Sequence, residues 1–257
     1  MAPTQKQLKA AKAKQLTTGK QPKARVARYL KKREPQLVEG PKSALLLKGI
    51  RCSDKMSGVL KDLRAMNAPN AKLLSRNNDI LPFEDAQSLE FLLTKNDCSL
   101  FALASHNKKR PNNLIMGRTF DHQLLDMVEL DICQYKGLHV HSGAPKKRIG
   151  SKPLVLFIGD TWHLDDTYAK LQNLLLDFFR GQPISKLALN GIDHLITFVL
   201  TDLGVVHMRT YYVKLKKNPS GGKVPLPYLA PSGPDMDIKV CDNVVLPESP
   251  FLSLSGQ

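Results

Sequence analysis

Short apolar runs of strand length alternate with apolar residues at helical spacing, and this order occurs twice along the chain. In the first occurrence, residues 44–50 predict a strand, and apolar side chains at helical spacing over residues 56–66 predict a helix with one buried face. Ser53 or Asp54 is placed to cap that helix, and Pro69 ends it. The same half is predicted to contain a second helix after Phe83-Glu84-Asp85, with Leu89, Leu92 and Leu93 inward, and strands at residues 98–105, 114–120 and 128–138.

The second occurrence follows the same order of strand, helix and antiparallel strands. Residues 154–159 predict a strand, and Asp165 or Asp166 can cap the helix after it. That helix ends at Gly181 and Pro183. The remaining predictions for this half are a buried helix face of Tyr168, Leu171, Leu175, Phe178 and Phe179, a hairpin at residues 194–201 and 205–215 with its turn at 202–204, a loop at residues 216–234, and a last strand at residues 237–246.

A local repeat supports this division. Residues 114–120 read LIMGRTF and residues 205–211 read VVHMRTY, and each follows an earlier strand-plus-helix unit. An internal repeat indicates a fold built from similar units. We therefore predict one α/β body made of two similar halves, which we expect to pack face to face around a pseudo-two-fold axis. The repeat pairs Arg118 with Arg209, Thr119 with Thr210, and Phe120 with Tyr211.

The positive charge of the chain is concentrated at its beginning. The formal net charge is +15, and the first 33 residues hold 11 Lys and Arg and no Asp or Glu. Such a tail is typical of a nucleic-acid arm or a nuclear import signal, and the alternative is a tail that only aids solubility. The predicted organisation is a basic tail at 1–40, a domain at 41–246 with halves 41–141 and 153–246 joined by a linker at 142–152, and a second tail at 247–257.

Membrane and secretory roles are not expected. Apolar runs such as residues 154–158 and 195–200 are far shorter than the roughly 20 residues that span a bilayer. The N-terminal region has no apolar segment typical of a secretory signal, and the basic tail lacks a large apolar face for a membrane surface. Because the cysteines are widely spaced, we expect reduced thiols in an intracellular protein. They are Cys52, Cys98, Cys133 and Cys241.

Basic clusters are the best candidates for function. Lysine acts as a point charge on phosphate, while arginine binds it in a bidentate way, so several clusters together predict contact with RNA. No aromatic pair is interleaved with these clusters, so we expect binding to RNA backbone and shape rather than to bases. The candidate RNA-binding residues are Lys23, Arg25, Arg28, Lys31, Lys32, Arg33, Arg51, Arg76, Lys108, Lys109, Arg110, Arg118, Lys146, Lys147, Arg148, Lys152, Arg209, Lys214, Lys216 and Lys217.

The repeated arginines have a second interpretation. Arg118 and Arg209 either pair with buried carboxylates or phosphates, or they are outward strand positions. A structural role is favoured for both. Asp121 and Asp126 are possible partners of Arg118 because they follow it closely.

Catalytic and metal sites are not predicted, and no cofactor is expected. The chain has no GxSxG motif, no Walker A motif and no GxGxxG motif that opens a helix after a strand. His139 and His141 are both able to reach one metal from a strand, but no convincing further ligands are near. The enzyme alternative is a phosphate-ester hydrolase that uses Asp160, Asp165 and Asp166, for which helix capping is the simpler explanation.

Several segments together resemble one known family. Residues 110–130, RPNNLIMGRTFDHQLLDMVEL, are similar to the central signature of the Brix-domain ribosome biogenesis factors. The run KGIRCSDKMSGVLKDLRAMNAPNAK within residues 44–72 and Phe83-Glu84-Asp85 resemble the same family. The resemblance covers about residues 25–240. The basic C-terminal extension of the family is not recognisable after Val240.

The resemblance implies a fold and a role. It implies a Brix-type domain of two halves similar to anticodon-binding domains. It also implies a nucleolar, non-enzymatic factor that forms a heterodimer with the regulator of ribosome synthesis protein. Together they would dock 5S rRNA with its two ribosomal proteins onto the pre-60S particle, against 25S/28S pre-rRNA, and support pre-rRNA maturation. The alternative is another Brix factor that acts on a different pre-ribosomal RNA.

Overall fold

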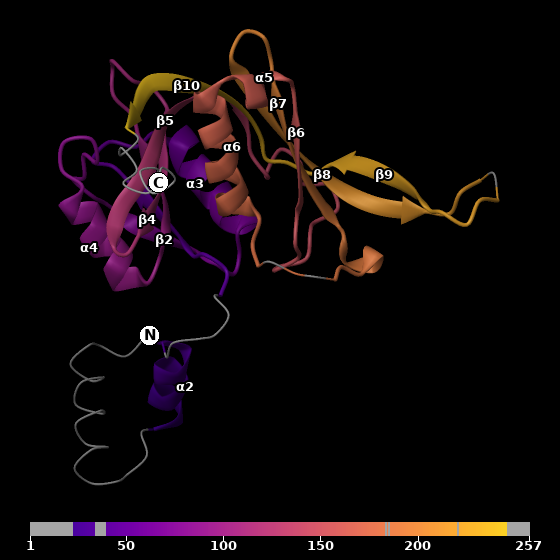
Figure 1. Cartoon of the computed structure of the whole chain (residues 1–257), viewed down its shortest axis with the longest axis horizontal. Coiled ribbons are helices and arrows are strands. Elements are labelled where there is room, and N and C mark those ends of the chain that lie inside the picture. The colour runs from indigo at the N-terminus through magenta and orange to yellow at the C-terminus, as the bar shows by residue number, and fades with distance from the viewer. Residues whose placement is uncertain (1–22, 34–39, 183, 185, 220, 246–257) are drawn as a thin grey trace, which may run out of the picture. The chain divides into compact units, whose positions relative to one another are not determined.

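The computed structural model describes residues 23–33, 40–182, 184, 186–219 and 221–245, so the predicted tail at 247–257 lies outside the described residues. The chain divides into two compact units, residues 1–40 and 41–257. In the first unit, helix α2 (Ala24–Arg33) contains five of the candidate basic residues. The second unit contains the sheet and the remaining described helices (Figure 1).

One mixed sheet of ten strands forms the second unit. Nine strands follow the order β2-β1-β3-β4-β5-β10-β8-β7-β6, and β9 pairs with β8 beside this path. The strands are β1 (Ala44–Lys48), β2 (Ala71–Asn77), β3 (Leu100–Ser105), β4 (Asn113–Phe120), β5 (Gln123–Lys136), β6 (Leu154–Ile158), β7 (His194–Leu200), β8 (Val205–Lys216), β9 (Leu226–Pro231) and β10 (Asp235–Val245). The helices are α3 (Asp54–Met66), α4 (Gln87–Asn96), α5 (Thr161–Leu164), α6 (Asp166–Phe179) and the 3-10 turn η1 (Leu189–Gly191).

Apart from the additional edge strand β2, the strand order is symmetric about its centre. Reading outward from the middle, β5, β4, β3 and β1 correspond to β10, β8, β7 and β6. Among these corresponding strands, the outer pairs β1–β3 and β6–β7 are parallel, and the inner pairs are antiparallel. Helix α3 follows β1 as α6 follows β6. The predicted α/β fold of two similar halves related by a pseudo-two-fold axis is therefore confirmed.

The junction between the halves differs from the prediction. The halves join edge to edge, because β10 pairs antiparallel with β5 over a register that includes Val240 and Leu130. The expectation that two separate units pack face to face is therefore wrong. One continuous core nevertheless serves both halves, since α3 and α6 contribute to the same cluster of buried residues. Both helices lie in the middle of the unit in Figure 1.

Local sequence explains both helices. The Ser53 side chain accepts a hydrogen bond from the backbone N–H of Met56 and caps α3, and the predicted apolar positions of that helix are buried. Asp165 caps α6 by accepting from the backbone N–H of Thr167 at 2.8 Å. Beneath α6, Phe157 lies between Trp162 and Phe198, with ring centroids 5.0 and 5.1 Å away. The caps predicted from sequence are thus confirmed at Ser53 and Asp165.

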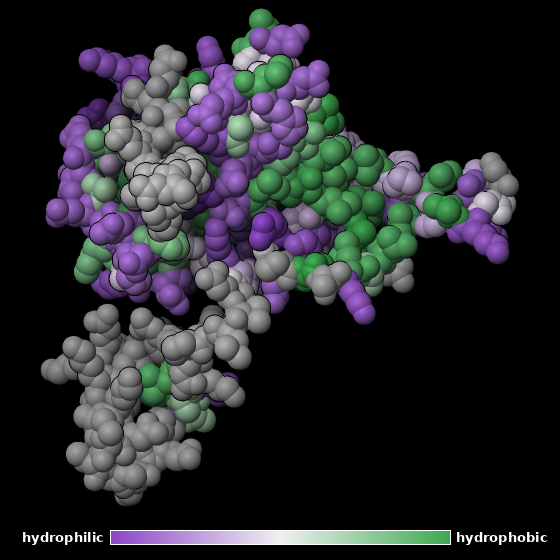
Figure 2. All heavy atoms as spheres, in the orientation of Figure 1, coloured by the Kyte–Doolittle hydropathy of each residue, from purple (hydrophilic) through white to green (hydrophobic). Residues whose placement is uncertain are grey.

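The two halves are covered differently on their second face. In the N-terminal half, α4 closes a second core in which Leu89 and Leu93 pack with residues of β1 and β3 such as Leu47 and Phe101. Within the described residues, no helix takes the place of α4 in the C-terminal half. Alternate residues of the edge strand β6 remain exposed there, namely Leu154, Leu156 and Ile158. Figure 2 shows the resulting apolar surface beside β6 and toward β9.

Sequence patterns missed several elements. Strand β2 has a mainly polar surface, and β9 contains Pro227 and Pro231, so neither shows the expected pattern. Both pair on only one side, where a strand tolerates polar residues and proline. The loop predicted for residues 216–234 is therefore wrong over β9. Strand β5 begins five residues before its predicted start at Val128. Among the described residues, no helix is long and apolar enough to cross a membrane.

Gly117 of β4 tests the packing of the N-terminal half. A Cβ atom at Gly117 would lie 2.4 Å from the carbonyl oxygen of Asp126 and 2.7 Å from the ring of Phe101. We predict that Gly117→Ala lowers the free energy of unfolding by about 1–3 kcal/mol, because backbone and a buried ring must move. Gly143→Ala, where nothing lies within 4 Å, is the matched control. Urea unfolding measures both, and equal midpoints for the two variants would contradict the prediction.

Candidate nucleic-acid interface

Arg118 is the centre of an ion-pair network that joins the two halves. Its guanidinium donates to both carboxylate oxygens of Asp126 on β5, at 2.7–2.9 Å, and to Asp177 on α6 at 2.6 Å. It also donates to Asn173 on α6 at 2.6 Å, and Lys42 contacts the same carboxylate of Asp177 at 2.6 Å. Asp126, one of the two predicted partners, is thus a partner of Arg118. Because this guanidinium already has two carboxylate partners, its contact with RNA stays a prediction with little support.

Arg209 occupies the equivalent place in the second half. It contacts Asp237 of β10 at 2.7 Å and donates to the carbonyl oxygens of Met208 and Met236 at 3.0 Å. His207 lies 2.7 Å from the same carboxylate. Burial raises the pKa of Asp237, but His207 and Arg209 lower it more strongly, so its net pKa lies below the usual value. Each repeated arginine therefore links its own strand, β4 or β8, to the neighbouring strand at the centre of the sheet, β5 or β10.

A basic surface lies at the carboxyl ends of three parallel strands. Strands β2, β1 and β3 are parallel, so the segments that follow them meet at one edge. Arg51 follows β1, Arg76 lies near the end of β2, and Lys108 and Lys109 follow β3. All four are exposed. We call these four residues the carboxyl-end surface, since ligands of open parallel sheets bind at this edge.

A shallow cavity of about 400 Å³ lies in this surface. Arg51 and Lys108 line it together with Asn77 and His106, and the beginning of α3 forms part of its wall at Ser53. The beginning of a helix carries partial positive charge, which adds to the charge of the basic side chains. Arg110, in contrast, forms an ion pair with the buried carboxylate of Glu129. The cluster at 108–110 is thus divided between two exposed lysines and one arginine that anchors the loop.

The second basic surface is the β8–β9 hairpin, which projects from the sheet (Figure 1). Lys214 lies opposite Tyr228, and the Nζ atom of Lys216 lies 3.9 Å from the ring centre of Tyr228. Tyr212 lies on the same face, with the Nζ atom of Lys214 5.8 Å from its ring centre. The expectation that no aromatic pair accompanies a basic cluster is therefore wrong here. It failed because β9, which brings Tyr228 to this cluster, was taken for a loop.

The linker cluster is held by contacts within the protein. Lys147 donates to the carbonyl oxygen of Met66 at 2.5 Å, and burial lowers its pKa. Lys152 donates to the carbonyl oxygens of Arg180 and Gln182, just after α6. Arg148 donates to Asp193 at 2.9 Å through its side chain. Lys146 is exposed.

The remaining candidates divide between the hairpin and the first unit. Lys217, next to Lys216, is exposed. In the first unit Lys23, Arg25 and Arg28 are exposed, and Lys31, Lys32 and Arg33 belong to α2. Their contacts with RNA stay predictions.

The candidate carboxylates have structural positions. Asp165 caps α6, and Asp166 forms an ion pair with Lys170 one turn later. Asp160 precedes α5 and makes no capping hydrogen bond. Across the described part of the chain, no group of three or more His, Cys, Asp or Glu side chains is arranged to hold a metal ion.

Comparison with known proteins identifies the family. The model of the Brix domain matches residues 49–242, which is most of the chain. The chain belongs to the Brix-domain family. The ribosome production factor 2 homolog of Homo sapiens is 42% identical over 216 residues, covering 83% of this chain and 69% of the relative. The homolog of Schizosaccharomyces pombe is 41% identical, covering 84% and 70%, and ribosome biogenesis protein RPF2 of Saccharomyces cerevisiae is 36% identical, covering 88% and 68%.

A solved structure agrees with the Brix fold. The crystal structure of a probable ribosomal biogenesis protein from Aeropyrum pernix K1 matches with a TM-score of 0.53 at 12% identity. It covers 79% of this chain and 99% of that protein. The family resemblance read from residues 110–130 is thereby confirmed, and the similarity lies with the ribosome production factor 2 members of the Brix family.

The Asp177 carboxylate tests the network between the halves. Burial raises its pKa, but the hydrogen bonds and charges of Lys42 and Arg118 lower it by more. The net pKa therefore lies below the ordinary value of 3.8. A carboxyl group with a lowered pKa stabilises the fold above its unfolded-state pKa, and this stabilisation is lost as pH falls through the folded-state pKa. We predict that Asp177→Asn costs about 1–3 kcal/mol at pH 7 and that the difference shrinks below about pH 4.

Urea unfolding at a series of pH values measures this effect. Asp202→Asn, in the exposed turn between β7 and β8, is the matched control and should leave the unfolding midpoint nearly unchanged. A difference between wild type and Asp177→Asn that stays constant from pH 7 to pH 3 would contradict the assignment.

Proposed function

We propose that this protein is a nucleolar, non-enzymatic factor of large-subunit ribosome biogenesis. With the regulator of ribosome synthesis protein as partner, it docks 5S rRNA and its two ribosomal proteins onto the pre-60S particle, where 25S/28S pre-rRNA is matured. The observation that carries this proposal is the match of most of the chain to the Brix domain and to ribosome production factor 2 homologs. The exposed basic surfaces and the exposed apolar side chains of β6 support the proposal.

The RNA side of the proposal rests on the two basic surfaces. Exposed lysines and arginines at the carboxyl-end surface contact phosphates and release condensed counterions, which makes binding salt-dependent. The hairpin adds Tyr212 and Tyr228, whose faces are able to stack on unpaired bases beside Lys214 and Lys216. Backbone binding thus occurs at one surface, and stacking on single-stranded segments occurs at the other.

The protein side rests on the uncovered face of the C-terminal half. Leu154, Leu156 and Ile158 are 39%, 46% and 45% exposed on the edge strand β6. An edge strand has free backbone groups that a partner strand can pair with, and its apolar side chains give the contact affinity. We assign this face and edge to the protein partner. It lies in the half that lacks a counterpart of α4 within the described residues.

Separate surfaces for RNA and protein explain docking without catalysis. When two partners are held together, the second contact becomes intramolecular, so modest contacts give strong overall binding. The Asp160, Asp165 and Asp166 alternative has less support, because Asp165 and Asp166 already have capping and ion-pair contacts. The other alternative, a Brix factor for a different pre-ribosomal RNA, is separated by the identity of the recovered RNA.

A pull-down from nuclear extract, with and without RNase, tests the assembly role. We expect 5S rRNA, its two ribosomal proteins and one stoichiometric RNase-resistant partner. Leu156→Lys on β6 should weaken recovery of that partner at least about tenfold, because it places a charge in an apolar contact. Leu203→Lys, in the turn between β7 and β8 where Leu203 is 86% exposed, is the matched control.

Each outcome of that pull-down has a distinct meaning. Recovery of small-subunit precursor RNA instead would favour the alternative Brix role. Recovery of no RNA would overturn both roles. Full recovery of the partner by Leu156→Lys would move the partner away from β6.

The carboxyl-end surface predicts a measurable salt effect. We predict that the double variant Lys108→Ala, Lys109→Ala weakens the binding of 5S rRNA. It should weaken the binding of unrelated RNAs of the same shape by about as much. The slope of log affinity against log salt should fall by about 1–2, since each lost phosphate contact removes roughly 0.7–0.9. Filter binding at several salt concentrations measures the slope. Lys61→Ala, exposed on α3, is the control and should leave the slope unchanged.

A further inference from the structure

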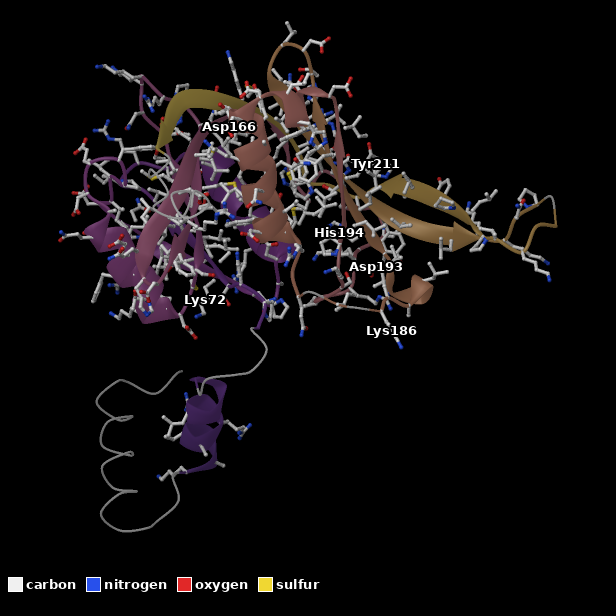
Figure 3. All side chains as sticks on the ribbon, viewed as in Figure 1. Lys72, Asp166, Lys186, Asp193, His194 and Tyr211 are labelled. Atoms are coloured by element: carbon white, nitrogen blue, oxygen red, sulfur yellow. The ribbon has the colours of Figure 1, made fainter. Side chains whose placement is uncertain are left out.

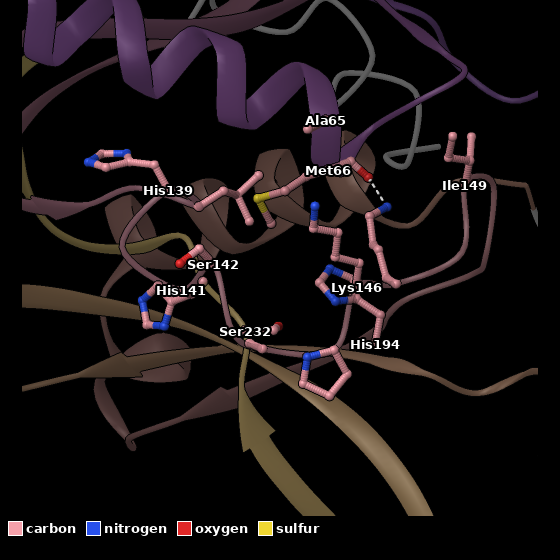
Figure 4. Close-up of a pocket in the computed structure, with 14 residues that line it drawn as sticks. Ala65, Met66, His139, His141, Ser142, Lys146, Ile149, His194 and Ser232 are labelled. Carbon is pink, nitrogen blue, oxygen red and sulfur yellow. Dashed lines mark hydrogen bonds between the residues drawn. The ribbon is translucent and has the colours of Figure 1, made fainter.

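A cavity of about 430 Å³ lies where the two halves and the linker meet. The last turn of α3 forms one wall at Met66, the linker forms another, and the beginning of β7 contributes His194 (Figure 4). The turn before β10 closes it at Ser232 and Gly233. Its volume lies within the roughly 300–1,000 Å³ that is usual for small-ligand pockets.

His194 gives this cavity unused hydrogen-bonding capacity. The residue is 2% exposed, and neither ring nitrogen has a hydrogen-bond partner within the described part of the protein. Figure 3 shows it beside Asp193 at the beginning of β7. Buried polar groups are nearly always satisfied by protein or ordered water, so two ring nitrogens without a protein partner at a cavity are able to hydrogen-bond to a ligand held there. Burial and the charge of Lys147 lower the pKa of His194 to about 4, so the ring is neutral near pH 7.

The neutral ring and the surrounding charges define the ligand chemistry. A neutral imidazole offers one donor and one acceptor, and the edge of a nucleobase offers both kinds of group in return. Met66, Pro145 and Ile149 line the cavity with apolar surface, which suits the faces of a base. The exposed Lys146 lines the same cavity, where its ammonium is available to a phosphate. A purely apolar protein side chain would leave His194 unsatisfied.

The geometry points to a nucleotide-binding pocket, in which an unstacked base contacts His194 and its phosphate contacts Lys146. The source of the nucleotide is an RNA chain bound by this protein, and this part rests on the proposed function. Proteins commonly read RNA through such bases that leave the stack. The pocket is distinct from the carboxyl-end surface and from the β8–β9 hairpin, because it shares no lining residue with the four basic residues or with the two tyrosines.

Two measurements on the full chain test this pocket. The first is titration with AMP, GMP, CMP and UMP while the ring nitrogens of His194 are followed by NMR. The second is ultraviolet crosslinking of bound 5S rRNA, with adducts located by mass spectrometry. For the wild-type chain we expect a His194 shift with at least one monophosphate and RNA adducts on Met66 or residues 138–149.

Variants separate binding from folding. His194→Phe keeps a ring of similar size and removes both nitrogens, and it should weaken monophosphate binding at least about tenfold. Lys146→Ala changes an exposed side chain, so its fold is retained, and it should weaken binding several-fold. Lys239→Ala, exposed on β10, is the matched control and should have no effect.

The outcomes distinguish this inference from the proposed function. Monophosphate binding that the two variants weaken supports the pocket, and RNA adducts at the cavity identify RNA as the source. Monophosphate binding without RNA adducts supports a pocket for free nucleotides. Absence of both the His194 shift and the cavity adducts, while 5S rRNA still binds, overturns the pocket and leaves the proposed function intact. Loss of all RNA binding with an intact His194 shift would overturn the proposed function and leave the pocket intact.

Discussion

The pairing of β10 with β5 is the constraint on which the rest of the second unit depends. The last described strand of the chain lies in the middle of the sheet, between β5 of the first half and β8 of the second. Partners such as Val240 and Leu130 are far apart in sequence, so this contact closes a long loop at a cost in chain entropy. Arg118 and Arg209 strengthen the same region, one by reaching α6 and the other by holding Asp237 on β10.

Two similar halves have acquired different surroundings around this junction. The first half has α4 and β2, which give it a second core and a broad edge of parallel strands with basic residues. The second half has β9, which extends a hairpin with aromatic and basic side chains, and it leaves β6 uncovered. A common strand order thus supports two basic surfaces of different character and one apolar face.

Much of this architecture could be predicted from the sequence, because caps and apolar spacing act locally. Ser53 and Asp165 mark the helix beginnings, and the echo around Arg118 and Arg209 marks the repeat. What failed depends on contacts between distant residues. The edge-to-edge junction is set by pairing across about a hundred positions, and β9 is a strand only because β8 pairs with it.

For the candidate site, too, the sequence predicts the local features but not the contacts between distant residues. Charge runs identify Lys108, Lys109, Lys214 and Lys216, which the structure places on exposed surfaces. They do not show that Lys147 turns inward to Met66 or that Arg118 already has carboxylate partners. Tyr228 and His194 carried no local signal, because each gains its role from neighbours in space. Tyr212, Lys214 and Lys216 are spaced two residues apart. In a strand this spacing places the tyrosine on the same face as the two lysines, and it was the indication that the sequence offered.

The open edge at β6 has a consequence for the amount of this protein that a cell can hold. Its free backbone groups and the exposed Leu154, Leu156 and Ile158 form a template with which a strand of another copy can pair. A high concentration of the chain with β6 uncovered would therefore favour self-association and precipitation. A protein strand that paired with β6 would remove this template.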